Sequence, residues 1–301
     1  EKIVGRTNVF ARVSPNQKYQ IVEAVQKAGH FVAVTGDGVN DAPALKTANI
    51  GIAMGKEGTD VAREVSELVI SDDNFATIVA GVEEGRIAYD NVRKVIFLLV
   101  STGAAELVLI TLCLVSGLPL PLLPVQILWL NLVTNGIQDV ALAFEPGEGD
   151  SLKKKPRPPK EHIFNRIMTE RTLVSALTMG VVGFGFFYYL IHIGWSEASA
   201  RNVLLLLMVL FENVHIGNCR SETKSALILS PFRSPILLTG AVVALLVHVA
   251  AMYLPLGQEL LGTEPVSLET WGIVAAIALT IFITMEIHKL LWWFRNRPAG
   301  R

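Results

Sequence analysis

The chain has 301 residues, a formal net charge of −1, 51% hydrophobic residues and 18% charged residues. It is too apolar for an ordinary soluble domain and too charged to lie wholly in a bilayer, so we expect a mixed protein. The near-zero charge and the lack of basic stretches interleaved with aromatic residues argue against a nucleic-acid partner. The two cysteines, Cys113 and Cys219, lie far apart and predict neither a disulfide framework nor a CxxC metal site.

The first 70 residues predict alternating helices and strands. Ser14, Pro15 and Gln17 have the spacing of a helix start, and the helix is expected to stop at Gly29. Apolar runs predict buried strands at 31–34 and 49–54 and a third strand at 68–70, and a helix is expected at 59–66. This alternation indicates a parallel α/β architecture. About 70 residues are few for a whole domain, so we expect the back half of a larger one.

The loop at 35–43 reads Thr-Gly-Asp-Gly-Val-Asn-Asp-Ala-Pro and follows the predicted strand 31–34. Open α/β sheets place ligands at the carboxyl ends of their strands. Gly36 and Gly38 allow a sharp turn beside a ligand, and Asp37 and Asp41 offer the hard oxygens that magnesium prefers. An ordinary turn favours the same residue types, so spacing alone leaves both interpretations open.

Residues 71–74 predict the cap of a helix that starts at about Phe75. Its first part carries charged residues, and the apolar run 95–115 follows without an obvious break. We therefore expect a cytoplasmic stalk at 75–93 that continues into a membrane and couples the two halves physically.

Six segments are long enough to cross the hydrocarbon core, which needs about 20 residues each. They lie near 94–116, 122–144, 172–193, 201–218, 235–254 and 271–293. If the stalk enters from the cytoplasm, the cytoplasmic loops hold the basic residues, and the outer loops hold little more than Arg201. These cytoplasmic residues are Lys153, Lys154, Lys155, Arg157, Lys160, Arg166, Arg171, Arg220, Lys224, Arg233, Lys289, Arg295, Arg297 and Arg301. The pattern predicts a multi-pass membrane protein with a cytoplasmic carboxyl terminus, and the compact loops favour a bacterial plasma membrane.

Polar residues inside the predicted spans indicate a cation site. Glu106 lies in the first span, where an isolated acid is costly enough to suggest a function. A polar stripe follows in the second span, mostly on one helical face, consisting of Asn131, Thr134, Asn135, Gln138 and Asp139. Gly136 beside Thr134 is expected to let this helix unwind and offer carbonyl oxygens. The alternative is a set of ordinary hydrogen bonds between helices.

Glu212, in the fourth span, has two competing interpretations. It is either a boundary carboxylate that reaches toward the membrane surface or, as the resemblance described below implies, an accessory cation ligand. His215 and Cys219 follow it without a convergent partner for a soft metal.

Three motifs resemble those of P-type ion-pumping ATPases, whose phosphorylation domain belongs to the haloacid-dehalogenase superfamily. The loop 35–43 is similar to the hinge motif of that family, and 10–18 resembles the segment that carries its phosphate-binding lysine. The segment 124–136, Pro-Val-Gln-Ile-Leu-Trp-Leu-Asn-Leu-Val-Thr-Asn-Gly, resembles a cation-binding membrane helix of the type II, calcium-pump-like branch. The resemblance covers essentially the whole chain and identifies it as the carboxyl-terminal portion of such a pump.

The resemblance implies an organisation and a set of phosphate-site residues. Residues 1–74 would be the carboxyl-terminal half of a phosphorylation domain with a Rossmann-like parallel sheet, 75–93 the stalk, and 94–301 a bundle of six transmembrane helices. Lys18 would neutralise the phosphoryl group, as transition-state charge requires. The remaining roles are cofactor binding by Thr35, Gly36 and Asp37, magnesium ligation by Asp37 and Asp41, and phosphoryl hydrogen bonding by Asn40.

The resemblance also implies ATP-driven cation transport, first of all of Ca²⁺, through an aspartyl-phosphate, with Mg²⁺ and ATP as cofactors. The implied cation ligands are Glu106, Asn131, Thr134, Asn135, Asp139 and Glu212. The family's Asp-Lys-Thr-Gly-Thr nucleophile motif is absent here, so this chain alone should not hydrolyse ATP. Its expected partner is the missing amino-terminal part, with the actuator, the nucleotide-binding domain and the first membrane helices. The chain would be a piece of a pump, one product of a split pump, or an expressed part of one.

Two departures keep alternatives open. In the calcium pumps the residue matching Asn135 is an aspartate and the one matching Gly103 is an asparagine. Both changes remove oxygen ligands or charge, so a pump for a monovalent cation, Na⁺ or K⁺, stays an alternative. A membrane-tethered phosphatase of the same superfamily is a second alternative, and a non-catalytic membrane partner is a third. The heavy-metal branch would carry a Cys-Pro motif in a span, which this chain lacks.

Overall fold

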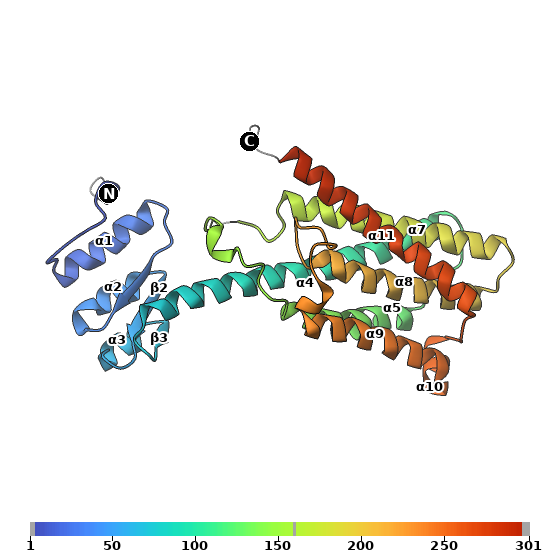
Figure 1. Cartoon of the computed structure of the whole chain (residues 1–301), viewed down its shortest axis with the longest axis horizontal. Helices are drawn as coiled ribbons and strands as arrows, with labels where there is room; N and C mark the ends of the chain where they lie inside the picture. The colour runs from blue at the N-terminus through green and yellow to red at the C-terminus, as the bar shows by residue number, and fades with distance from the viewer. Residues whose placement is uncertain (1–3, 159–160, 297–301) are drawn as a thin grey trace. The chain divides into compact units, whose positions relative to one another are not determined.

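The computed structural model describes residues 4–158 and 161–296. The predicted cytoplasmic residues Lys160, Arg297 and Arg301 lie outside these ranges. The described residues form two compact units (Figure 1). The first contains residues 4–85 and 152–158, and the second contains 86–151 and 161–296.

The first unit contains the predicted amino-terminal helix. Helix α1 spans Pro15–Lys27, and Ser14 and Gln17 form a reciprocal capping box at its start. The backbone amide of Ser14 donates to the Gln17 side chain at 2.8 Å, while the Ser14 hydroxyl accepts from the Gln17 amide at 3.4 Å. Gly29, with φ of +89°, follows the helix end, as expected for a residue in a left-handed conformation.

A three-stranded sheet forms the centre of the first unit. Its strands are all parallel and lie in the order β1-β2-β3; they are β1 Ala33–Gly36, β2 Ile50–Met54 and β3 Leu68–Ile70. Three short helices connect them, namely the 3₁₀-helix η1 Val39–Asp41, α2 Ala42–Thr47 and α3 Asp60–Val65. The parallel α/β arrangement is confirmed for this small sheet.

The first strand differs from the prediction of a buried strand at 31–34. The strand begins at Ala33 and runs to Gly36, and Phe31 is 59% exposed. The reason is that β1 lies at a sheet edge and pairs only with β2 among the described residues. The central strand β2 is the one whose middle residues are buried.

Helix α4 spans Phe75–Val115, 41 residues without interruption. Asn74 accepts a hydrogen bond from the amide of Ala76 at 3.0 Å, and Asp72 accepts one from the hydroxyl of Thr77 at 2.7 Å. These contacts satisfy donors at the helix start. The predicted continuity of a charged segment with an apolar one is therefore confirmed.

The second unit is helical. Five helices of the described chain are long and apolar enough to cross a membrane, namely α4, α7 Arg166–His192, α8 Glu197–Cys219, α9 Pro235–Tyr253 and α11 Leu268–Arg295. The predicted span at 122–144 consists of three consecutive pieces, α5 Pro124–Trp129, the π-helix η2 Leu130–Thr134 and α6 Asn135–Ala143. A sixth span there stays a prediction. The short helix α10 Pro255–Leu261 follows α9.

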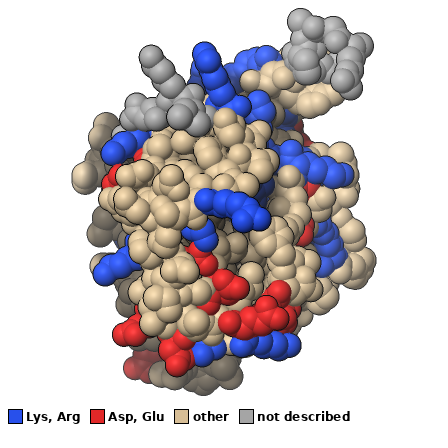
Figure 2. Space-filling view, turned by 90° about the vertical axis from the view of Figure 1, so that its left-hand side faces the viewer, with Lys and Arg blue, Asp and Glu red and all other residues tan. Residues whose placement is uncertain are grey.

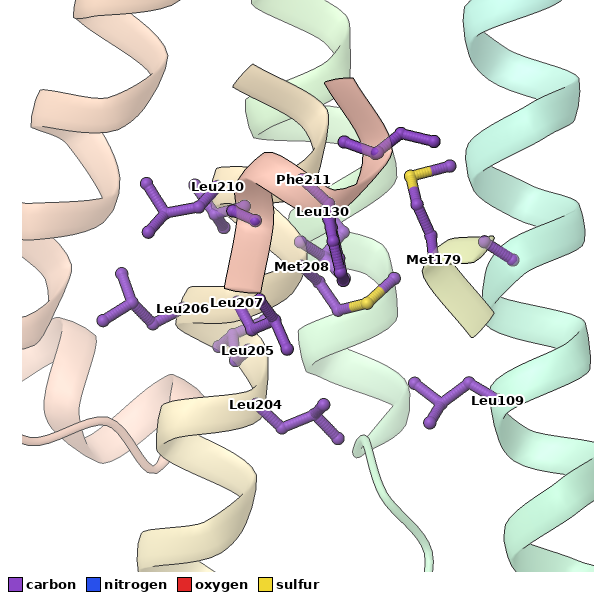
Figure 3. Close-up of a cluster of buried hydrophobic side chains, with 14 of the residues drawn as sticks. Leu109, Leu130, Met179, Leu204, Leu205, Leu206, Leu207, Met208, Leu210 and Phe211 are labelled. Carbon is purple, nitrogen blue, oxygen red and sulfur yellow. The ribbon is translucent and has the colours of Figure 1, made fainter. Parts of the chain in front are cut away.

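Helix α8 lies in the core of the second unit. Its residues Leu204 to Met208 are each at most 1% exposed. Figure 3 shows this row of side chains together with Leu109 of α4, Leu130 of η2 and Met179 of α7. A helix that is apolar on every side is expected at the centre of a bundle, so a polar residue close to this row on α8 is expected to be surrounded by protein.

Charges on the surface are mixed in sign. Figure 2 shows basic and acidic side chains on the same face, with the acidic ones gathered toward its lower edge. This face therefore offers no surface of a single charge sign.

Candidate functional site

The loop 35–43 lies at the carboxyl end of a strand, as predicted. Thr35 and Gly36 are the last two residues of β1, η1 follows at Val39–Asp41, and α2 begins at Ala42. The parallel register pairs Gly36 with Ala53 of the neighbouring strand β2. The loop therefore leaves the sheet at the edge where α/β proteins bind ligands.

Lys18 and Asp41 come together across this loop. Lys18 Nζ, on the first turn of α1, donates to Asp41 Oδ1 at 2.5 Å. The side chains are 39% and 14% exposed, respectively. Partial burial would raise the pKa of Asp41, but the hydrogen bond and charge of Lys18 outweigh it, so the pKa lies below its ordinary value. Asp41 is thus held as a carboxylate beside a cation.

Gly36 is required for this contact. A Cβ atom at Gly36 would lie 2.6 Å from the Cβ of Asp41, closer than two such atoms approach. At Gly38 the nearest atoms to an added Cβ are 3.9 Å away, which is ordinary contact. The first glycine makes room for Asp41 over the end of β1, while the second has no such role.

Asp37 and Asn40 differ from Asp41 in their surroundings. Both are exposed, as is Thr35. The backbone carbonyl of Asp37 accepts a hydrogen bond from the amide of Thr59 at 2.7 Å, which fixes the loop against the start of α3. The oxygens of Asp37, Asn40 and Asp41 are hard donors of the kind that suits Mg²⁺, so the donor chemistry fits that ion.

Asp73 is a residue that the sequence analysis missed. Its carboxylate accepts hydrogen bonds from the amides of Gly55, Lys56 and Glu57 at 2.6–3.1 Å. These bonds, with that of Lys56 foremost, lower the pKa of Asp73. The segment 55–57, which is bound to Asp73, leads to Thr59, whose amide donates to the backbone carbonyl of Asp37. The paired Asp72-Asp73 was visible in the sequence only as part of a helix cap.

The second group of predicted residues lies inside the helical unit. Glu106 of α4 is 5% exposed and accepts hydrogen bonds from the Asn131 amide, whose Nδ2 lies 3.2 and 3.0 Å from its two oxygens. The same Nδ2 also donates to the carbonyl of Ile127 at 3.0 Å. The structure therefore brings together the acid of the first span and the start of the polar stripe.

A π-helix, rather than an unwound turn, interrupts the polar helix. The segment η2 covers Leu130–Thr134, before Gly136, and Gly136 itself lies within α6. The expected unwinding at Gly136 is therefore wrong. A π-helical turn pairs residues five apart and rotates the side chains that follow, and such turns are common at functional sites. Here it orients Asn131 and Thr134 toward α4 and α8.

Glu212 lies in the interior of the bundle, 1% exposed. It accepts a hydrogen bond of 2.5 Å from the hydroxyl of Thr134, which is fully buried. The alternative of a boundary carboxylate that reaches the membrane surface is therefore wrong, because α8 is enclosed by other helices.

Asn135 and Asp139 complete the predicted set. Asn135 is fully buried, and its Nδ2 donates to the hydroxyl of Thr102 on α4 at 3.2 Å. Asp139 is half-buried. Glu106 and Asp139 both lie close enough to Glu212 for their charges to interact. Among the described residues, no three His, Cys, Asp or Glu side chains converge closely enough to hold a metal by themselves, so a cation here would also need amide or hydroxyl oxygens.

Known proteins are similar to this chain over most of its length. Residues 119–291 match the family described as "Cation transporting ATPase, C-terminus". The chain is 41% identical to a calcium-transporting ATPase of Bacillus subtilis over 92% of this chain and 31% of that protein. It is 39% identical to a probable cation-transporting ATPase F of Mycobacterium tuberculosis, over 98% of this chain and 33% of that protein. For calcium-transporting ATPase type 2C member 2 of Rattus norvegicus the identity is 37%, over 99% and 32%. The chain spans about a third of the length of these relatives.

Proposed function

The chain belongs to the cation-transporting P-type ATPases, and on this premise we propose that it supplies the cation site and part of the phosphorylation domain of an ATP-driven pump. The observation that carries the proposal is the buried polar cluster in the helical unit. Two carboxylates, Glu106 and Glu212, lie inside an apolar bundle and accept hydrogen bonds from Asn131 and Thr134 of the same interrupted helix. Acids in such a position are costly unless they serve a charged substrate.

Calcium is the first candidate for the transported cation. Glu106, Asn131, Thr134 and Glu212 offer the carboxylate, amide and hydroxyl oxygens that calcium takes in sets of six to eight. Curated relatives named as calcium-transporting ATPases support this choice. Because Asn135 is a neutral amide, a pump for Na⁺ or K⁺ remains the alternative. In this proposal 124–143 is a sixth membrane span.

The loop 35–43 with Lys18, called the soluble site from here on, would receive the phosphoryl group. ATP would phosphorylate an aspartate in the amino-terminal part of the pump. Asp37 and Asp41 would hold Mg²⁺, which neutralises phosphoryl charge when bound. Asn40, which is exposed on the loop, would donate to phosphoryl oxygens, and Lys18 would bring a positive charge. Since Lys18 contacts Asp41, a phosphoryl group entering the site would compete with Asp41 for its ammonium group.

Transport would follow from a change at the soluble site that the stalk conveys to the membrane. Helix α4 carries Glu106 and begins at Phe75, directly after the soluble sheet, so a single helix joins the two sites in the chain. A local change of charge at one end that favours one of two arrangements at the other is the usual form of such a switch. The host membrane would be a bacterial plasma membrane with the soluble part in the cytoplasm.

The test uses the full-length parent protein reconstituted in lipid vesicles. ATPase activity is measured with calcium, sodium, potassium, magnesium and manganese in turn, for the wild type and for Glu106→Gln. We expect one cation to stimulate hydrolysis and Glu106→Gln to abolish that stimulation. Glu197→Gln is the matched control, because Glu197 lies on the first turn of α8 with a 57% exposed side chain. Phosphate-ester hydrolysis that ignores every cation and Glu106 would instead indicate a membrane-tethered phosphatase.

A further inference from the structure

Several side chains near the proposed cation site have polar atoms without a partner. Among the described residues these include Oδ1 of Asn135, both amide atoms of Gln138, and Oε1 of Glu212. The three side chains are at most 1% exposed. Buried polar atoms are nearly always hydrogen-bonded, so three orphaned oxygens on neighbouring turns indicate a group that binds there.

The hydrogen bonds determine which atoms are free. Thr102 donates its hydroxyl to the carbonyl of Leu98 at 2.9 Å, so it accepts from Asn135 Nδ2 and leaves the Asn135 oxygen without a partner. Asn131 differs, because its amide nitrogen is shared between Glu106 and a backbone carbonyl. Both oxygens of Glu106 therefore have a partner, whereas unpartnered oxygens lie on Asn135, Gln138 and Glu212, and on the half-buried Asp139 of the same helix.

Contacts on both sides of Gln138 place it in the bundle interior. Thr134 contacts Glu212, and Glu145 contacts Arg220 at 2.8 Å, so the helix carrying Gln138 runs beside α8 in the same direction. Gln138 follows Thr134 by four residues, about 6 Å along the axis and on the same face. It therefore lies one turn beyond the Thr134–Glu212 contact, toward the Glu145–Arg220 pair.

We propose that Gln138 is a further cation ligand, which with the free oxygens of Asn135 and Glu212 forms a subsite one turn from the Glu106–Asn131 pair. The ligand class is a hard, oxygen-seeking cation such as Ca²⁺ or Na⁺, because every free acceptor is an amide or carboxylate oxygen. This inference rests on the proposed function and adds a ligand that neither the motif nor the family resemblance assigns. It also explains why a glutamine is buried where it makes no hydrogen bond to the described chain.

The test is direct cation binding by the full-length protein in detergent without ATP. Unfolding temperature is followed against Ca²⁺ and, separately, Na⁺, for the wild type and for Gln138→Leu. A cation that binds the folded state raises the unfolding temperature, and the rise grows with the logarithm of the cation concentration relative to Kd, so each series gives an apparent affinity. We expect Gln138→Leu to weaken the affinity for the cation that binds by about 10- to 100-fold. Without cation, its unfolding temperature should stay the same or rise, because leucine is of similar size and no hydrogen bond is lost.

Gln126→Leu is the matched control. Gln126 is 1% exposed, donates to the carbonyl of Leu261 at 2.8 Å and accepts from the amide of Leu123 at 2.8 Å. Its replacement should lower the unfolding temperature without cation and leave the affinity unchanged. Gln138→Glu, which keeps an oxygen donor, should retain cation binding and so separate a ligand from a packing role.

Each outcome decides between defined alternatives. If Gln138→Leu binds the cation with wild-type affinity while Glu106→Gln binds it more weakly, the subsite is overturned. The proposed function then stays in place. A glutamine held by a bridging water would give that result. If neither cation shifts the wild type, and the transport assay also shows no cation stimulation, the proposed function fails and the subsite fails with it.

Discussion

The two candidate sites neutralise their charges in opposite ways. In the first unit, which the proposed function makes the soluble unit, the carboxylate of Asp41 is matched by the ammonium group of Lys18, and both retain contact with solvent. In the helical unit, Glu106 and Glu212 accept hydrogen bonds from an amide and a hydroxyl, and among the described residues neither forms an ion pair. An acid with neutral partners has no ion-pair partner that a cation must displace. In the Lys18–Asp41 pair, a ligand instead competes with the partner residue for the ammonium group or for the carboxylate.

The largest predicted loss of stability concerns an ion pair that is enclosed in the helical unit. Arg220 and Glu145 have side chains 6% and 2% exposed, and Arg220 Nε donates to Glu145 at 2.8 Å. Removing one member of a buried pair leaves an uncompensated charge, at a cost of about 3–5 kcal/mol. Glu145→Ala should therefore lower the unfolding temperature of the full-length protein strongly.

The control for this prediction is an exposed pair in the soluble unit. Asp60 and Arg63 lie 2.5 Å apart, with side chains 96% and 37% exposed. Asp60→Ala should cost less than about 1 kcal/mol, because water and salt screen such pairs. Equal losses for Glu145→Ala and Asp60→Ala would show that burial does not distinguish the two units.

The second prediction concerns Lys18. If its ammonium group stabilises phosphoryl charge, Lys18→Ala should lower the ATPase turnover of the full-length protein by about 100- to 1000-fold, the usual cost of losing one such donor. Calcium or sodium binding measured without ATP should be unchanged, because the lysine is in the other unit. Lys46→Ala, on the exposed side of α2, is the control and should keep both properties. A normal turnover in Lys18→Ala would assign the lysine to structure alone.

The third prediction compares the effect on stability of replacing one glycine in each unit, Gly36 and Gly136, with alanine. Gly36→Ala would force a methyl group against the Asp41 Cβ, so we expect a loss of about 1–3 kcal/mol from overpacking. Gly136→Ala meets nothing within 4 Å and should be neutral or stabilising by about 0.5–1 kcal/mol, because alanine is the better helix former. Thermal unfolding of both variants is the measurement. A destabilising Gly136→Ala would mean that this helix needs its flexibility after all.

Much of the soluble site could be predicted because its signals are local. The Ser14–Gln17 cap, the stop near Gly29 and the strand-to-helix loop at 35–43 all depend on residues close in sequence. Two features were not predictable in the same way. The exposure of Phe31 follows from the position of β1 at a sheet edge, and the role of Asp73 depends on amides 16–18 residues away.

For the site in the helical unit, the sequence predicted which residues take part but not how they are arranged in space. The apolar context of Glu106 and the polar stripe could be recognised from the sequence, since such residues are rare in membrane spans. The burial of Glu212 could not, because it depends on α8 being enclosed by other helices. Neither could the π-helix at 130–134, since the sequence signal, Gly136, lies after it.

The smallest predicted effect is a pH dependence of the soluble site. Because Lys18 lowers the pKa of Asp41 below its ordinary 3.8, the folded state binds a proton less readily than the unfolded state. The stabilisation is therefore complete above about pH 4 and is lost as the pH falls through the lowered value. Asp41→Asn should flatten this acid dependence, measured by hydrogen exchange of the β1 and η1 amides in the full-length protein. Asp60→Asn is the control, because the Asp60 side chain is 96% exposed and its charge partner is Arg63 of the same helix rather than a residue of the loop. The same acid dependence in Asp41→Asn and the wild type would contradict the prediction, and would mean that the charge match between Lys18 and Asp41 does not help to hold the loop in place.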